Sequence, residues 1–389
     1  MSEIKVNSIK GVGASAAAIT VNNSDGTCTA NLTNKPNRNL IINGAMQVAQ
    51  RGTSSASSSY QTVDRFAHFG GGWDAAMTQI QSDVTSGTTP YTLGFRKAFK
   101  LQNGNQTSGA GAGDNIYIRY RPEAQDIASS GWNYTSTSSF ITLSFWVKSS
   151  VAQNFFGYID TSDGTQKMYP FQTGSLSADT WTKVTKTIPG HADLAFNSDN
   201  GQAFGINWVQ FMGTDFTANS AVVDTWKAQS DTERVPDNTS TWYTTNNATF
   251  ELTGVQLEVG SVATDFEHRS FAVEKRLCMR YFQKYTNIGA TGFVPDNGSK
   301  SYAHVFHFPI EFRATPTLTT TNTGSTSGQY IGDGDNTVTI SSLNAAAHTT
   351  QIGEMYFNLS SDLTNFRGAY PSSSDSSSRQ TTFFFTAEL

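Results

Sequence analysis

The sequence predicts an all-β protein: an antiparallel, jelly-roll-like β-sandwich, followed by a smaller C-terminal β domain and preceded by an extended N-terminal segment. Two observations predict this fold class. Apolar and polar residues alternate with the period of strands, most clearly over 115–121, and clusters of Ser, Asp, Asn and Gly separate the apolar runs. Helical periods are missing between these runs, which excludes a parallel sheet built through crossover helices.

The large sandwich is predicted over residues 38–270. Its further strand candidates, each bounded by small polar residues, are 140–148, 155–159, 205–211 and 249–259. The stretch 271–285 is predicted to be a short helical or linker junction, because 271–282 combines charged residues with helix formers. Beyond it, the C-terminal β domain is predicted over 286–389, with strand candidates at 305–312, 318–321, 337–340 and 381–387.

The N-terminal segment, 1–37, has too few apolar residues for a core of its own. Ile4, Val6, Ile9 and Val12 can be buried only against another chain or another protein. We therefore expect this segment to serve attachment or contact between subunits.

Composition excludes several classes of function. Charged residues make up only 15% of the chain and the net charge is −5, which does not suit a nucleic-acid-binding protein.

The start of the sequence lacks the features of a secretory signal, and no apolar stretch approaches the ~20 residues of a membrane span. Cys28 and Cys278 stand too far apart in the sequence to suggest a disulfide framework or a zinc site. Synthesis in a cytoplasm is the simplest expectation.

Catalytic and cofactor motifs are absent from the sequence, so no catalytic residue and no cofactor is predicted. The glycine-rich stretch 109–114 leads into a strand rather than a helix, and a loop is predicted there instead of a phosphate site. Glycoside hydrolysis needs two carboxylates whose spacing is set in space, not in sequence. The acids that could be tested for this role are Glu123, Asp126, Asp160 and Asp163.

Metal sites are not predicted either. His304 and His307 are three residues apart, a spacing that places them on opposite faces of a strand. The stretch 333–336 resembles the start of a calcium loop but lacks the acidic residue that such a loop needs at its twelfth position. A tight turn is the preferred interpretation.

The positive indication of function is a set of aromatic residues in polar loops. A sugar ring has an apolar face and a rim of hydroxyls, which suits an aromatic side chain flanked by Asn, Asp or Ser. The alternative is that these rings close the ends of the sandwich core or pack between subunits. The glycan-binding candidates are Trp73, Trp132, Tyr134, Trp226, Trp242 and Tyr243.

Three stretches resemble a β-sandwich domain that is common in bacteriophage tail fibre proteins. The first is 39–53 (NLIINGAMQVAQRGT) with Tyr60 and 64–66 (DRF). The second is the mid-domain strand 144–149 (SFWVKS), and the third is the close of the domain at 254–260 (GVQLEVG), 263–269 (ATDFEHR), Glu274 and 278–282 (CMRYF). The final residues, 383–389 (FFFTAEL), are similar to the ends of such proteins.

This resemblance implies a homotrimer that is assembled in the host cytoplasm and becomes part of the virion. The N-terminal segment would attach to other virion proteins and the distal β domains would adhere to host cell-surface glycan. A β-helical depolymerase region is missing from the sequence, which favours a protein that is not an enzyme. Two alternatives stay open: a purely structural whisker, collar or capsid fibre, and a glycan depolymerase.

Arg51 and Arg65 follow strongly apolar stretches at the start of the sandwich. They could pair with Glu258 or Glu267 and so tie its first strand to its last, or they could be solvated surface residues.

Overall fold

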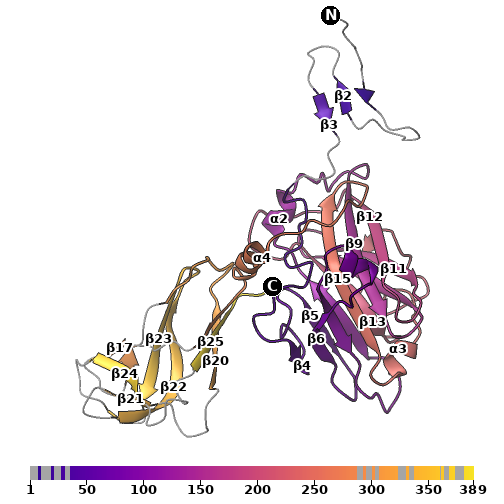
Figure 1. Ribbon diagram of the computed structural model, residues 1–389. Helices are drawn as coiled ribbons and strands as arrows, with labels where there is room; N and C mark the ends of the chain where they lie inside the picture. Colours follow the sequence, from indigo (N-terminus) through magenta and orange to yellow (C-terminus); the bar gives the residue numbers. More distant parts are fainter. Residues whose placement is uncertain are drawn as a thin grey trace, which may run out of the picture.

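A computed structural model of the protein shows a small N-terminal sheet, a two-layered β-sandwich and a C-terminal β unit (Figure 1). The described residues are 8–9, 19–21, 28–30, 36–286, 292–294, 300–302, 306–322, 330–332, 337–359, 361–362, 368–372 and 381–389.

The N-terminal sheet has three short antiparallel strands, β1 (Ser8–Ile9), β2 (Ile19–Val21) and β3 (Cys28–Ala30). Figure 1 shows this sheet apart from the sandwich. Ile9 is 54% exposed, so its apolar side chain is still available for contact with another surface. The other three apolar residues singled out in this segment, Ile4, Val6 and Val12, lie outside the described residues.

The predicted antiparallel sandwich is confirmed, because two six-stranded sheets pack face to face and every strand pair in them is antiparallel. One sheet has the order β14 (Lys227–Ala228), β11 (Lys167–Ser175), β10 (Asn154–Thr161), β13 (Phe204–Met212), β8 (Asn115–Tyr120) and β5 (Ala67–Gly71). The other has the order β12 (Thr182–Pro189), β9 (Phe140–Ser149), β15 (Thr249–Val259), β7 (Lys97–Gln102), β6 (Thr78–Asp83) and β4 (Ser54–Ser55).

The main core lies between these sheets and follows from strand alternation. On β9, Leu143, Phe145 and Val147 are buried in the core, whereas Ser144 and the residues two apart from it face the outside of the sandwich. Strand β13 departs from this pattern because all nine of its residues are buried. Its Val209 and Met212 belong to a second apolar cluster, in which they are buried by Tyr158, Met168 and Val235.

Helices are few and short: α1 (Thr89–Thr92), α2 (Ala124–Ala128), α3 (Thr241–Thr244) and α4 (Phe271–Cys278). The helix expected within 271–282 is confirmed as α4. It begins after Ser270, whose side chain accepts a hydrogen bond from the backbone N–H of Val273. Among the described helices, none has the length and apolarity needed to cross a membrane.

The C-terminal unit contains two antiparallel sheets. The smaller has the order β16 (Phe282–Thr286), β25 (Thr381–Thr386) and β20 (Thr317–Asn322). The larger has the order β18 (Lys300–Tyr302), β17 (Gly292–Phe293), β24 (Gly368–Ser372), β21 (Tyr330–Gly332), β22 (Thr337–His348), β23 (Ile352–Leu359) and β19 (Phe306–His307). Phe308, Phe312 and Phe385 pack edge to face or tilted in the core of this unit.

A buried ion pair joins the C-terminal unit to the sandwich. Arg65, whose side chain is completely buried, contacts Glu388 at 2.5 Å, and Arg51 contacts the other oxygen of Glu388 at 3.2 Å. Arg51 also lies 3.8 Å from Asp64. Burial raises the pKa of Asp64 to about 6, although Arg51 and Gln50 act in the opposite direction.

The expectation that Arg51 or Arg65 pairs with Glu258 or Glu267 is therefore wrong. Both arginines pair with Glu388, which follows β25 and is far from the sandwich in the sequence. Glu258 lies 3.7 Å from Arg38, and Arg269, 3.4 Å from Glu267, donates to the carbonyl oxygens of Asn39 and Ile41. A different pair of arginines therefore ties the start of the sandwich to its close.

We expect Glu388→Gln to lower the free energy of unfolding by about 3 kcal/mol or more, because it leaves the charge of Arg65 buried without its carboxylate. Denaturant unfolding measures this change. Asp83→Asn is the matched control, since the Asp83–Lys97 pair at 2.6 Å is largely exposed and its loss should barely alter the unfolding midpoint. Equal effects of the two substitutions would contradict the structural role of Glu388.

Candidate functional site

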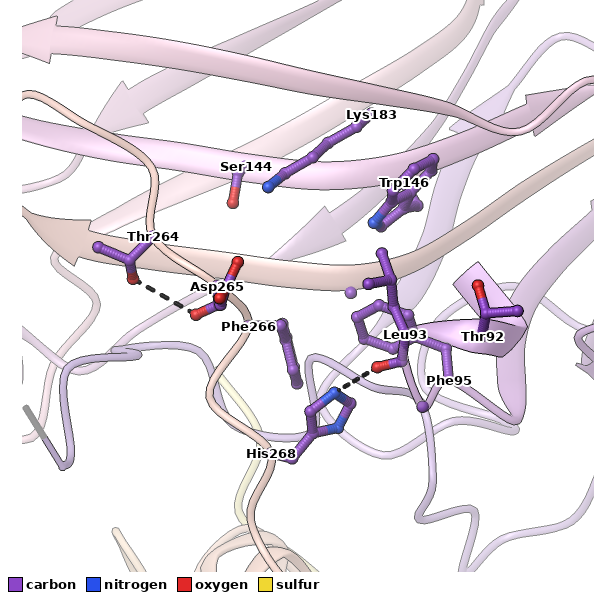
Figure 2. Close-up of a pocket in the computed structure, with 12 residues that line it drawn as sticks. Thr92, Leu93, Phe95, Ser144, Trp146, Lys183, Thr264, Asp265, Phe266 and His268 are labelled. Carbon is purple, nitrogen blue, oxygen red and sulfur yellow. Dashed lines mark hydrogen bonds between the residues drawn. The ribbon is translucent and has the colours of Figure 1, made fainter. Parts of the chain in front are cut away.

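A cleft of about 470 Å³ opens on the outer face of the sheet that contains β12, β9 and β15. Its floor carries Ser144 and Trp146 from β9 and Lys183 from β12, and Lys183 is the cross-strand partner of Trp146. Figure 2 shows the opposite wall, formed by the segment that contains Asp265, Phe266 and His268. The residues that end α1 and follow it close the cleft at one side; they are Thr92, Leu93, Gly94 and Phe95.

Two aromatic side chains, Trp146 and Phe266, give the cleft an apolar surface, and Phe95, which is 1% exposed, packs against Phe266. Trp146 is half-buried, and Phe95 and Phe266 lie edge to face with ring centroids 4.9 Å apart. His268 packs against both phenylalanines at 5.2 and 4.9 Å, and its Nε2 hydrogen-bonds the carbonyl oxygen of Leu93 at 2.8 Å. These contacts hold the wall in place beside the indole of Trp146.

Polar groups accompany the rings. The Trp146 indole N–H, the Ser144 hydroxyl, the Lys183 ammonium and the Asp265 carboxylate all line the cleft. Within the described part of the chain, none of these four groups takes part in a hydrogen bond or ion pair. They therefore provide two groups that donate, one that accepts and a hydroxyl that can do both, in a cavity of the size that small-molecule sites have.

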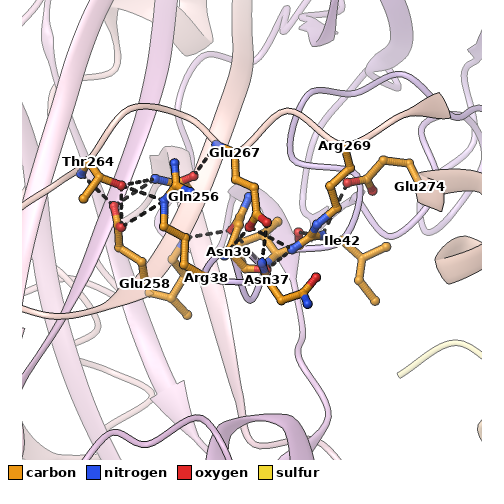
Figure 3. Close-up of polar contacts among 12 residues, drawn as sticks. Asn37, Arg38, Asn39, Ile42, Gln256, Glu258, Thr264, Glu267, Arg269 and Glu274 are labelled. Carbon is orange, nitrogen blue, oxygen red and sulfur yellow. Dashed lines mark hydrogen bonds and ion pairs between the residues drawn. The ribbon is translucent and has the colours of Figure 1, made fainter. Parts of the chain in front are cut away.

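The wall of the cleft is held by a polar network that connects it to the start of the sandwich (Figure 3). Glu258 accepts hydrogen bonds from the backbone N–H and the hydroxyl of Thr264 at 2.8 and 2.6 Å. The backbone N–H of Glu267 donates to Gln256 at 2.8 Å, and its carboxylate accepts from the backbone N–H of Asn39 at 2.8 Å. Asp265 and Phe266 lie between these two anchored residues, so their positions are fixed from both sides.

Gly254 allows the floor to take its shape. It has a positive φ of 61°, and the pairing of β15 with β9 shifts register between Thr253 and Gln256. A Cβ at this position would lie 2.7 Å from Phe95 and 3.1 Å from Trp146. Only glycine fits here, because both rings approach its backbone directly.

Three of the aromatic residues predicted to bind glycan are core residues. Trp132, Trp242 and Tyr243 are 4%, 0% and 1% exposed, so they present no ring face to a ligand and that prediction is wrong for them. Tyr243 stacks on Phe211 at 4.6 Å, and its hydroxyl donates to Asp114 at 2.9 Å. Trp132 lies in a loop and the other two lie in the short helix α3, and all three belong to the main core, which is the alternative considered for them.

The other three candidates are half-buried and pack against the core from separate loops. Trp73 lies beside His68 at 6.3 Å and Tyr134 lies edge to face with Phe196 at 4.9 Å. Trp226 donates its indole N–H to the carbonyl oxygen of Pro189 at 2.7 Å. The structure does not bring any of them into the cleft around Trp146.

Sequence reasoning missed Trp146, which it treated as part of a mid-domain strand. The alternation of side chains over 144–149 indicates where Trp146 points, because this residue shares the non-core face of β9 with Ser144 and Lys148. A tryptophan on the polar face of a strand is the feature that could have identified the cleft.

The acids considered for glycoside hydrolysis have structural partners. Glu123 accepts hydrogen bonds from Arg280 at 2.7 and 2.9 Å and from the Tyr281 hydroxyl at 2.6 Å. Burial by itself raises the pKa of Glu123, but these bonds outweigh it and hold the pKa below its usual value. Asp160 accepts from the side chain of Asn207 at 2.5 Å, and its pKa is raised because burial outweighs its polar contacts.

The remaining two acids are placed on different elements. Asp126 lies in α2, where burial and the neighbouring charge of Glu123 raise its pKa. Asp163 accepts hydrogen bonds from the backbone and side chain of Asn197, both at 2.9 Å, and so fixes a loop.

The metal-ligand candidates give no site in the described residues. His307 is exposed on β19, whereas His304 and the stretch 333–336 lie outside the described residues. Across the part of the chain that the structure describes, no group of three or more His, Cys, Asp or Glu side chains could hold a metal ion.

Comparisons with known proteins find likeness in structure alone. No protein-family model and no curated protein matches the sequence. Solved structures that resemble the chain include the enzymatically active domain of tailspike protein 4 from bacteriophage CBA120, at 11% identity, a TM-score of 0.30 and 58% of this chain. The match spans only 22% of that tailspike chain.

Two further structures are carbohydrate-binding modules. The N-terminal cellulose-binding domain of Cellulomonas fimi β-1,4-glucanase C matches at 10% identity and a TM-score of 0.27, over 56% of this chain and 99% of its own. The family 11 module of Clostridium thermocellum, solved with a mixed-linked tetrasaccharide, matches at 10% identity and a TM-score of 0.25, over 55% and 98%. At these identities and TM-scores, the likenesses assign no ligand to this chain.

We expect Gly254→Ala to deform the cleft floor. The new methyl group collides with Phe95 and Trp146, and the positive φ adds about 1–2 kcal/mol of strain. The measurements are thermal unfolding and the NMR resonance of the Trp146 indole N–H. Gly71→Ala is the control, because a Cβ there meets nothing within 4 Å. An unshifted indole resonance in Gly254→Ala would show that this glycine does not position the ring.

Proposed function

We propose that the protein is a bacteriophage tail fibre protein that adheres to glycan on the host cell surface, and that the cleft around Trp146 binds the sugar. The observation that carries the proposal is the lining of this cleft, where aromatic rings stand next to hydrogen-bonding groups that have no partner within the described chain. The apolar face of a pyranose stacks on an indole, and its hydroxyls accept from Lys183 and the indole N–H and donate to Asp265.

The proposed activity is adhesion without cleavage. Hydrolysis requires a carboxylic acid and a second carboxylate on either side of a glycosidic bond. The cleft is lined by a single carboxylate, that of Asp265, and Glu123 is occupied by Arg280 and Tyr281 at the junction of the two units. The protein would therefore hold its glycan and leave the chain intact.

The rest of the proposal concerns assembly. The protein would act as a homotrimer in the virion after assembly in the host cytoplasm, with the N-terminal segment attached to other virion proteins. The exposure of Ile9 on the small N-terminal sheet supports a contact there. Three copies would raise the avidity of a shallow sugar site without a deeper pocket.

We expect Trp146→Ala to weaken binding to a microarray of bacterial surface glycans about tenfold or more, since the ring supplies the stacking surface. Lys183→Gln, an exposed position, should weaken it less and leave the fold intact. Trp73→Ala is the matched control, because this half-buried tryptophan lies outside the cleft. Loss of binding in Trp73→Ala but not in Trp146→Ala would show that the glycan binds at the loops and not in the cleft around Trp146. Failure of the unaltered protein to bind at micromolar concentration would favour a purely structural appendage.

Removal of residues before Asn39 should abolish attachment to virions and leave a folded protein that still binds cells. Light scattering should give a particle mass three times that of one chain, both before and after truncation. Incubation of the full chain with host surface polysaccharide should leave the polymer mass unchanged. A monomer, or shortened polysaccharide, would overturn the corresponding part of the proposal.

A further inference from the structure

A second cleft, of about 450 Å³, lies where the sandwich meets the small sheet of the C-terminal unit. We call it the junction cleft. The sandwich contributes Arg51, Ser59, Tyr60 and Gln61, and the sheet contributes Phe282, Thr319, Phe384 and Thr386. It shares no lining residue with the cleft around Trp146.

Strand register explains why aromatic and hydroxyl side chains meet there. Phe384 of β25 is paired with Lys284 of β16 on one side and with Thr319 of β20 on the other. Phe282 is likewise paired with Thr386. Cross-strand partners point to the same face of a sheet, so these residues form one continuous surface.

The two rings in the junction cleft stack on each other, and one cation lies near each ring. Arg51 lies 3.6 Å from the centroid of Phe282, which stacks on Phe384 at 5.9 Å with 23° between the planes. The Lys284 ammonium lies 5.8 Å from the centroid of Phe384. Phe282 is 1% exposed, whereas Phe384 is half-buried, so Phe384 is the ring that a ligand can reach.

The two cations differ in their surroundings. The charge of Arg51 is balanced by Glu388 at 3.2 Å and Asp64 at 3.8 Å. Lys284 is exposed and, among the described residues, has no carboxylate within ion-pair distance. Lys284 does not line the junction cleft itself, but as the cross-strand partner of Phe384 it places one uncompensated positive charge beside the cleft.

Hydroxyl groups complete the surface. In the described part of the chain, the side chains of Thr319, Thr386 and Ser59 make no hydrogen bond. Each can donate one and accept one from a ligand.

We propose that the junction cleft binds an acidic sugar residue, of the uronate or sialate class. The apolar face of the sugar would stack on Phe384, its carboxylate would face Lys284 and its hydroxyls would bond Thr319 and Thr386. The proposal rests on the proposed function in that the acidic residue belongs to a host glycan, but it uses different residues. The two can therefore fail separately.

The test uses the full-length protein and three probes: methyl β-D-glucuronide, the methyl glycoside of N-acetylneuraminate, and neutral methyl β-D-glucoside. Affinities are measured by NMR titration. We expect an acidic probe to bind more tightly than the glucoside, and Lys284→Gln to remove the difference, about threefold to fivefold. The acidic probe that binds identifies the class. Lys275→Gln, an exposed lysine on α4, is the matched control and should change nothing.

Phe384→Ala should lower the affinity for the acidic probe about tenfold. Because this ring also packs on Phe282, Thr319→Val is the second variant; it is exposed, keeps the side-chain volume and should weaken binding without loss of stability. Retention of acidic-sugar binding in Trp146→Ala supports a separate site. Equal binding of acidic and neutral probes, or no effect of Lys284→Gln and Thr319→Val, overturns the junction cleft while leaving the cleft around Trp146 untouched.

Discussion

The sandwich depends on the backbone hydrogen bonds that β15 makes after the bulge at Gly254. Up to Leu252 this strand pairs with β7, and beyond it the segment that begins at Asn39 takes over that edge. Leu40 donates to the carbonyl of Leu257 at 2.8 Å, and Val255 donates to Gly44 at 2.9 Å. Without this segment, buried N–H and C=O groups would lose their partners, at a cost of about 1–3 kcal/mol each.

The same segment brings buried charge into the structure. Asn43 donates its backbone N–H to Glu274 of α4 at 2.6 Å, and Arg269 lies 3.4 Å from that glutamate. Burial raises the pKa of Glu274, while Asn43 and Arg269 favour its charged form. One connected network of hydrogen bonds and ion pairs therefore joins the start of the sandwich, the wall of the Trp146 cleft and α4. The same network holds the wall of the cleft in position.

The strands could be predicted from the sequence because a two-residue period is a local property, and β8, β9, β10, β13 and β15 lie where alternation placed them. The burial of residues between the strands could not be predicted, because it depends on which connecting segments fold back over the sandwich. Trp242 stands between polar neighbours and is completely buried. The partner of Arg65 could not be predicted from neighbouring residues either, because Glu388 is 323 positions away and several other acids have the same charge. The outward position of Trp146 could be predicted, because the alternation along its strand places it on the face opposite the core.

The pairing of Arg65 with Glu388 has a consequence for the order of events during synthesis. A growing chain exposes the arginine more than 300 residues before its glutamate leaves the ribosome. Until then the guanidinium stays hydrated, so the face of the sandwich that meets the C-terminal unit cannot close around it. Docking of the C-terminal unit is thereby postponed until Glu388 has been made, and a polypeptide that stops before it would keep an open, hydrated surface at this junction that proteases can recognise.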